Sequence, residues 1–176
     1  MKRTFTLQEI NAFDRQQFVT TLESVFEGPP WIVEQAWQAR PFHSLAHLHQ
    51  NLCAVMEQAP VKQKIALIQA HPDLVGRAAL AGTLTPASMN EQASAGLDRL
   101  TQEEIAMFTR YNQAYRDKFG FPFVICVREN KKKSILAGFE TRLHHTHNQE
   151  IEIALSEIAK IGWLRLQATV QGDTVE

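Results

Sequence analysis

A histidine at the end of an apolar, helix-compatible run is the first residue of this sequence that could do chemistry. The stretch "LIQAHPDLVG" (67–76) places His71 directly before Pro72. Because a residue that precedes proline is disfavoured in the α region, the sequence predicts that a helix stops at His71. The imidazole would then point into the space beyond the helix. Its ordinary pKa lies near neutrality, so it suits general acid/base chemistry.

A second group of polar side chains follows in "TPASMNEQASAGL" (85–97). Thr85 and Pro86 have the residue types of an N-cap and a first helical position. In such a helix Ser88, Glu91 and Gln92 are spaced i, i+3 and i, i+4, so they share one face. A hydroxyl, a carboxylate and an amide on one face could line a pocket for a small, hydrogen-bonding ligand. The alternative is that these side chains only cap and solvate the start of the helix.

Arg165 is the third candidate, because it lies where an apolar side chain is expected. It continues, four turns after Ile151, a stripe of small and apolar residues in the last predicted helix, namely Ile151, Leu155, Ile158 and Gly162. A guanidinium on such a stripe needs an anion, either a structural carboxylate or the carboxylate of a bound substrate. Arg142 is a weaker case, since Glu140 and the helix surface could satisfy it.

Histidine spacing raises a metal-dependent hydrolase as an alternative. His43 and His47 are spaced i, i+4, and three more histidines lie at 144, 145 and 147. The first pair lacks the glutamate of a zinc-protease helix, and no third ligand is evident. Neither Cys53 nor Cys126 belongs to a CxxC pair. We therefore interpret these histidines as structural, with no metal site, and the cysteines as reduced, buried thiols.

The composition limits the class of partner. Hydrophobic residues make up 44% of the 176 residues, and the formal net charge is -1. A nucleic-acid surface needs a basic excess, and the one cationic run, 131–133, reads as a solvated turn. No run reaches the about 18 apolar residues of a membrane span, and the first ten residues lack the apolar core of a signal peptide. We expect a cytoplasmic protein that binds neither nucleic acid nor membrane.

Helix start and stop signals recur along the whole chain. Thr6 with Glu9 and Thr101 with Glu104 have capping-box spacing, Thr146 with Gln149 is a weaker example, and Gly120 suits a helix C-terminus. One helix is expected to carry Phe13, Phe18, Leu22, Val25 and Phe26 before Gly28, and another to cover 44–58.

Only "FPFVICV" (121–127) resembles a strand, and it has no evident partner, so we expect a short extended segment threaded through the core. The sequence predicts an all-α, compact single domain of about seven to nine helices over residues 1–170, with a short tail at 171–176.

Five motifs together resemble one family. They are "PWIVEQAWQARPF", "LIQAHPDL", "LTPASMNEQASAGL", "NQAYRDKFGFPFVICV" and "EIAKIGWLRL". In order and spacing they are similar to the 2-oxo-4-hydroxy-4-carboxy-5-ureidoimidazoline (OHCU) decarboxylases of urate breakdown, over about residues 7–167. One departure is Val75, which stands between Leu74 and a glycine that often follows that leucine directly.

The resemblance implies an all-α lyase of purine metabolism that converts OHCU to (S)-allantoin without a cofactor and forms a homodimer. It implies that His71 is catalytic, and we take Glu91 as a second catalytic residue as a hypothesis of our own. It also implies a substrate pocket lined by Pro72, Ser88, Met89, Asn90, Glu91, Gln92, the backbone of Phe123, Val124, Ile125, Cys126 and Val127, and Arg165.

The chemistry agrees with these residue types. Loss of CO2 from OHCU pushes two electrons into a neighbouring ring C=N bond, so the substrate holds its own electron sink and requires no cofactor. His71 would deliver the proton, and Glu91 would polarise the substrate hydroxyl or fix the His71 tautomer. Arg165 would hold an anionic or carbonyl oxygen, and Ser88 and Gln92 the ureido and ring amides. The rival interpretation is a helical module that binds a partner in an apolar groove.

Overall fold

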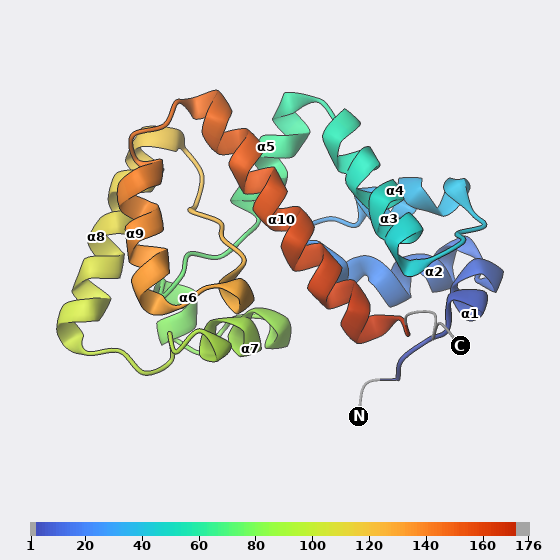
Figure 1. Ribbon diagram of the computed structural model, residues 1–176, viewed down its shortest axis with the longest axis horizontal. Helices are drawn as coiled ribbons and strands as arrows, with labels where there is room; N and C mark the ends of the chain where they lie inside the picture. Colours follow the sequence, from blue (N-terminus) through green and yellow to red (C-terminus); the bar gives the residue numbers. More distant parts are fainter. Residues whose placement is uncertain (1–2, 172–176) are drawn as a thin grey trace. The chain divides into compact units, whose positions relative to one another are not determined.

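The computed structural model describes residues 3–171, and this part of the chain is built from helices (Figure 1). The α-helices are α1 (Leu7–Ala12), α2 (Arg15–Leu22), α3 (Trp31–Ala36), α4 (Leu45–Gln58), α5 (Val61–Gln69), α6 (Arg77–Leu80), α7 (Pro86–Ser94), α8 (Gln102–Phe119), α9 (Lys132–Arg142) and α10 (His147–Thr169). Three 3-10 helices are η1 (Glu23–Val25), η2 (Trp37–Ala39) and η3 (Val127–Glu129). The predicted all-α class is confirmed. Apart from the single-turn α6, the nine α-helices of the described range match the predicted number.

The chain divides into two compact units. One contains the residues up to Lys64 and those from Ile158 onward, and we call it the terminal unit. The other, the central unit, is Ile65–Glu157. The single domain over 1–170 stays a prediction, and residues 172–176 of the predicted tail lie outside the described residues. Within residues 3–171, every helix is too short or too polar to cross a lipid bilayer.

In the terminal unit the first predicted helix is in fact two helices. Phe13 adopts an extended backbone, and Asp14 starts α2 with a capping box to Gln17. The expectation of one continuous helix through Phe13 is therefore wrong, because this local cap ends one helix and starts the next. The predicted apolar residues of α2 and η1, Phe18, Leu22 and Val25, are nevertheless buried. Gly162 lets α10 approach Phe26 closely, since a Cβ there would lie 3.2 Å from the ring.

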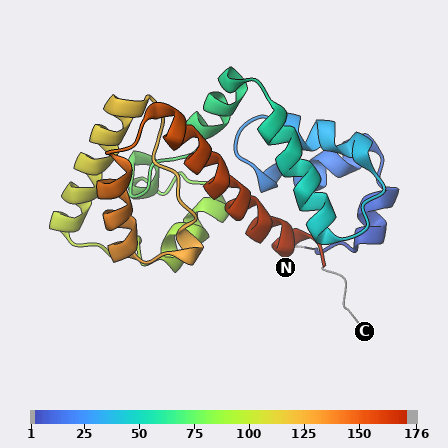
Figure 2. The ribbon, with the colours of Figure 1, turned by 45° about the horizontal axis from the view of Figure 1, so that its top comes forward.

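In the central unit, α8 and α9 pack side by side, as both views show (Figures 1 and 2). The predicted capping box of Thr101 and Glu104 starts α8, and Gly120 ends it with a φ of 77°. That left-handed conformation costs glycine nothing, whereas it strains other residues. The lysine run opens α9 instead of forming a turn, and Lys132 pairs with Glu104.

The predicted extended segment is present and buried. Residues 121–126 follow α8 without joining a sheet in the described chain, and Phe121, Phe123 and Cys126 are at most 1% exposed. Tyr115 of α8 contacts the rings of Phe121 and Phe123, and Phe123 stacks on Phe139 of α9. The segment ends at Cys126, one residue before its expected end, because Val127 already begins the 3-10 helix η3.

Candidate functional site

His71 lies two residues beyond the end of α5, as its position before proline predicts. Its side chain is 7% exposed. The Nδ1 atom lies 2.9 Å from the carbonyl oxygen of Leu67, one turn earlier. Because a carbonyl oxygen only accepts, Nδ1 must carry a hydrogen and donate it. In the neutral ring Nε2 is then the basic nitrogen, so this contact selects the tautomer.

The loop after His71 is held by two side chains of α8. Arg116 donates from Nε to both carboxylate oxygens of Asp73, at 2.9 and 3.2 Å. Asn112 donates from Nδ2 to the carbonyl oxygen of Leu74 at 2.8 Å. These bonds satisfy polar groups of the loop and tie it to a long helix, so His71 is followed by an ordered backbone.

Gln92 of α7 holds the same loop from another side. Its Oε1 accepts from the backbone N–H of Val75 at 3.1 Å, and its Nε2 donates to the carbonyl oxygen of Asp73 at 3.4 Å. The side-chain amide of Gln92 thus bonds one N–H and one carbonyl oxygen of the loop backbone, as a residue of a neighbouring strand would. The sequence predicted Gln92 as a direct ligand and gave no indication of this loop contact.

Val75 has a left-handed backbone with φ 52°, although its side chain is β-branched and 2% exposed. Glycine adopts such a positive φ without strain, whereas a β-branched residue does not. The next residue, Gly76, has no room for a side chain, since a Cβ would lie 2.6 Å from the Asp73 Cβ. The loop therefore requires a glycine at 76 and tolerates a strained residue at 75.

Helix α7 begins as the sequence predicts. Thr85 is the N-cap and accepts from the Ser88 N–H, and Pro86 is the first helical residue. Ser88, Glu91 and Gln92 are buried on one face, whereas Met89 is 44% exposed and Asn90 is exposed too. Burial of the first three excludes simple solvation of the helix start as their role. Of the five predicted residues of α7, the structure thus groups three and places two on the solvent side.

Two contacts bring the extended segment toward these groups. Gln69, at the end of α5, donates from Nε2 to the carbonyl oxygen of Gly120 at 3.0 Å, directly before the segment. At the other end, η3 packs against α7. In the central unit, the end of α5, the extended segment and α7 therefore belong to one neighbourhood. Phe123, Val124, Cys126 and Val127 are buried, and Pro72 and Ile125 are partly exposed.

Arg165 belongs to the terminal unit. Its Nη2 lies 3.0 Å from the Glu27 Oε1, and the two side chains are 10% and 13% exposed. Its Nη1 is 3.4 Å from the carbonyl oxygen of Ser24. Of the two kinds of anion that the sequence left open, the structure supplies a structural carboxylate, Glu27.

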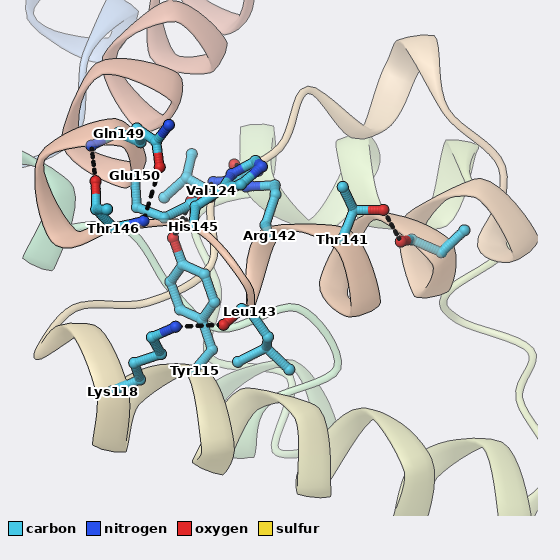
Figure 3. A network of polar contacts seen from close by, with 11 residues as sticks. Tyr115, Lys118, Val124, Thr141, Arg142, Leu143, His145, Thr146, Gln149 and Glu150 are labelled. Atoms are coloured by element: carbon cyan, nitrogen blue, oxygen red, sulfur yellow. Dashed lines mark hydrogen bonds and ion pairs between the residues drawn. The ribbon is translucent and has the colours of Figure 1, made fainter.

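The more deeply buried arginine is Arg142. It donates from Nε to Glu150 Oε2 at 2.8 Å and from Nη1 to the Val124 carbonyl oxygen at 2.7 Å (Figure 3). The expected partner, Glu140, instead accepts from the hydroxyl of Tyr111. That expectation is wrong because Arg142 is the last residue of α9, and its side chain turns inward, toward the first residues of α10.

Glu150 is the centre of this buried network. It is 0% exposed and accepts from Arg142, from the Tyr115 hydroxyl and from His145 Nδ1, the last at 2.9 Å (Figure 3). Burial, and then the hydrogen bond to Glu150, raise the pKa of Tyr115 far above its usual value, so the phenol stays protonated and donates. His145 thus has a structural partner, as the sequence interpretation of the late histidines predicts.

The described residues contain no cluster of three or more histidine, cysteine, aspartate or glutamate side chains that could hold a metal ion. The rings of His43 and His47 stack on each other, and the Nδ1 of His47 accepts from the backbone N–H of His43. Cys53 and Cys126 are free thiols. Burial raises the pKa of both, that of Cys53 to about 11, so neither is an activated nucleophile.

Comparisons with known proteins agree on one family. The model of the family described as OHCU decarboxylase matches residues 11–167. The 2-oxo-4-hydroxy-4-carboxy-5-ureidoimidazoline decarboxylase of Halalkalicoccus jeotgali is 36% identical over 162 residues, which are 92% of this chain and 90% of that protein. A "Uric acid degradation bifunctional protein" of Bacillus subtilis is 36% identical over 97% of this chain but over only 34% of its own length.

A solved structure has a similar fold. The crystal structure of an (S)-allantoin synthase matches with a TM-score of 0.75 and 26% identity over 95% of this chain. The chain spans 54% of the length of that protein. Fold and relatives together define an all-α decarboxylase, a lyase. The chain belongs to the OHCU decarboxylase family, whose sequence model covers most of its length.

Proposed function

We propose that this chain decarboxylates OHCU to (S)-allantoin in urate degradation, with His71 as the residue that delivers the proton. The observation that supports this role is the hydrogen bond from His71 Nδ1 to the Leu67 carbonyl oxygen. It is compatible with both charge states of the ring, because Nδ1 carries hydrogen in each. Nε2 can therefore gain and lose a proton while the ring keeps its orientation.

The reaction needs little from the protein beyond orientation and a proton. The bond between the carboxylate carbon and the ring carbon breaks, and CO2 leaves. The bonding pair forms a C=C bond to the neighbouring C=N carbon, and the C=N pair moves to the ring nitrogen, which takes a proton. The resulting enol is protonated on carbon, which creates the stereocentre of allantoin. Because the substrate accepts the electrons itself, we propose that no cofactor takes part.

We propose Glu91 as the partner that polarises the substrate hydroxyl. The other role considered for it, selection of the His71 tautomer, is already filled by the Leu67 carbonyl oxygen. Glu91 and Ser88 lie on the same buried face of α7, which supports a shared role in binding the polar substrate. Both groups would orient the substrate so that the breaking bond aligns with the C=N system.

We propose two functions for Gln92, namely ordering of the loop after His71 and binding of the substrate. Its contacts with Val75 and Asp73 order the loop after His71. We keep it as a candidate ligand of the ureido group, together with Pro72, Met89, Asn90 and the backbone of 123–127. Arg165 is proposed to bind an oxygen of the substrate, with Glu27 fixing its guanidinium. We also expect a homodimer.

The test is circular dichroism of OHCU made in situ from urate, with EDTA present, with and without the purified protein. Rapid appearance of the (S)-allantoin signal would support the reaction, its stereochemistry and its independence from metal. A signal no faster than the spontaneous decay would overturn the proposal. If the protein were active without EDTA and inactive with it, only the cofactor-independent mechanism would be overturned.

A further inference from the structure

The extended segment joins no sheet in the described chain, and side chains bind several of its backbone groups. Glu157 accepts from the Cys126 N–H at 3.0 Å, and Asn130 donates to the Cys126 carbonyl oxygen at 2.9 Å. The Cys126 carbonyl oxygen also accepts from the backbone N–H of Glu129 at 3.1 Å. Arg142 donates to the carbonyl oxygen of Val124 at 2.7 Å. Residues i and i+2 of an extended chain turn their backbone polar groups to the same edge. One edge of the segment is thus bonded by side chains, and the opposite edge carries the polar groups of Phe123 and Ile125.

Arg142 is the best fixed of these anchors. Its guanidinium bonds Glu150, whose side chain is 0% exposed, and the side chain of Arg142 is 8% exposed. The guanidinium carbon also lies 4.2 Å from the ring centre of Phe123, in the segment itself. A planar group held by a carboxylate on one side and an aromatic ring on another has little freedom. The Val124 carbonyl oxygen is therefore bound to a rigid donor (Figure 3).

We propose that Arg142, held by Glu150, is a positioning residue that fixes the backbone of 123–127 as a preformed binding edge for the substrate. This inference rests on the proposed function, which places that backbone in the substrate site. A preformed edge binds without the cost of ordering a loop. Such an edge contacts substrate and transition state alike, so its loss should raise KM and leave kcat nearly unchanged.

The test uses the double variant Arg142→Met/Glu150→Gln. Removal of both charges avoids an unpaired buried charge, which is the main danger of a single substitution. The glutamine oxygen can still accept from the Tyr115 hydroxyl. We expect KM to rise at least about tenfold, kcat to change less than about threefold, and the amides of 121–127 to exchange hydrogen at least about tenfold faster.

Tyr115→Phe is the matched control. It removes the hydrogen bond to Glu150 and the longer one, of 3.4 Å, from Arg142 Nη2, but it leaves the bond between Arg142 Nη1 and the Val124 carbonyl oxygen in place. We expect it to lower Tm while KM and the exchange of 121–127 stay at wild-type values. An equal rise of KM in this control would overturn the proposal, because general loosening of the network would then explain the effect.

A second variant covers the case in which the double variant does not fold. Arg142→Lys keeps the positive charge beside Glu150, but an ammonium group cannot reach both Glu150 and the Val124 carbonyl oxygen as the planar guanidinium does. KM and the hydrogen exchange of 121–127 should therefore both rise, as in the double variant. Unchanged KM in a folded variant would overturn the positioning role alone. Wild-type protein without OHCU turnover would instead overturn the proposed function, and it is measured first.

Discussion

His71 and Leu67 are joined by a hydrogen bond of 2.9 Å between Nδ1 and the carbonyl oxygen, across one turn at the end of α5. This bond orients the imidazole with a backbone group instead of the carboxylate that often does so in catalytic histidines. A backbone acceptor carries no charge that titrates. In the proposed mechanism, proton transfer from His71 to the substrate therefore uses Nε2, because Nδ1 is bonded to Leu67.

Replacement of His71 by asparagine should separate structure from catalysis. The amide nitrogen of asparagine can keep the bond to the Leu67 carbonyl oxygen, but no group takes the place of Nε2. We expect kcat to fall about 10²–10⁴-fold, the usual range for loss of an acid–base group, with an unchanged helical circular dichroism spectrum. Near wild-type turnover would remove His71 from the mechanism.

Glu91→Gln should lower kcat about 100-fold, because the amide keeps the size of the carboxylate but not its charge. Steady-state kinetics by the allantoin signal provides the measurement. Glu103→Gln, at an exposed position in the first turn of α8, is the matched control and should keep full activity. A normal kcat for Glu91→Gln would show that the charge has no part in the reaction.

Gln92→Leu should destabilise the loop after His71. The buried N–H of Val75 would lose its acceptor, which costs about 1–3 kcal/mol. Urea unfolding should therefore show a loss of that size, and the Val75 amide should exchange faster. The control is Gln113→Leu, an exposed residue of α8 that bonds Asp117, for which we expect a change within about 0.5 kcal/mol. Equal losses in the two variants would contradict the loop contact.

The strain at Val75 can be isolated by comparing Val75→Gly with Val75→Ala. Both lose a buried side chain, but only glycine adopts the positive φ without the cost of about 1–2 kcal/mol that other residues incur. We expect the glycine variant to be the more stable of the two by about 0.5–1 kcal/mol in urea unfolding. At Ala106, an exposed helical position of α8, glycine should instead be less stable than alanine by about 1 kcal/mol.

The thiol of Cys53 should react slowly with Ellman's reagent at pH 8. Its pKa is raised from 9.0 to about 11, first by burial and then by the charge of Glu57, so thiolate is scarce in the folded protein. The unfolded thiol loses its proton at lower pH than the folded one. Between pH 9 and about 11 the unfolded state therefore binds fewer protons than the folded state. The contribution of Cys53 to the free energy of unfolding is complete below pH 9 and is lost as the pH rises through this range. Fast labelling of folded protein at pH 8 would contradict the shift.

The local signals of the sequence were sufficient for the helix starts and for the position of His71. Thr85 and Thr101 cap helices as predicted, because a cap involves groups only three residues apart. A capping box of Asp14 and Gln17 also divides the first predicted helix into two. The helical spacing of Phe13 and Phe18 indicated one continuous helix, so this cap was missed from the sequence. Proline at 72 ended α5 near the histidine by its own steric effect.

The tertiary structure decided which polar groups meet. Periodicity placed Ser88, Glu91 and Gln92 on one face, but only packing shows that this face is buried and that Gln92 bonds Val75, seventeen residues away. In the same way, the choice of Glu150 over Glu140 for Arg142 depends on how α9, α10 and the extended segment pack. Spacing along one helix fixes a direction for a side chain. Its partner is set by distant segments, whose approach follows from burial of the core as a whole.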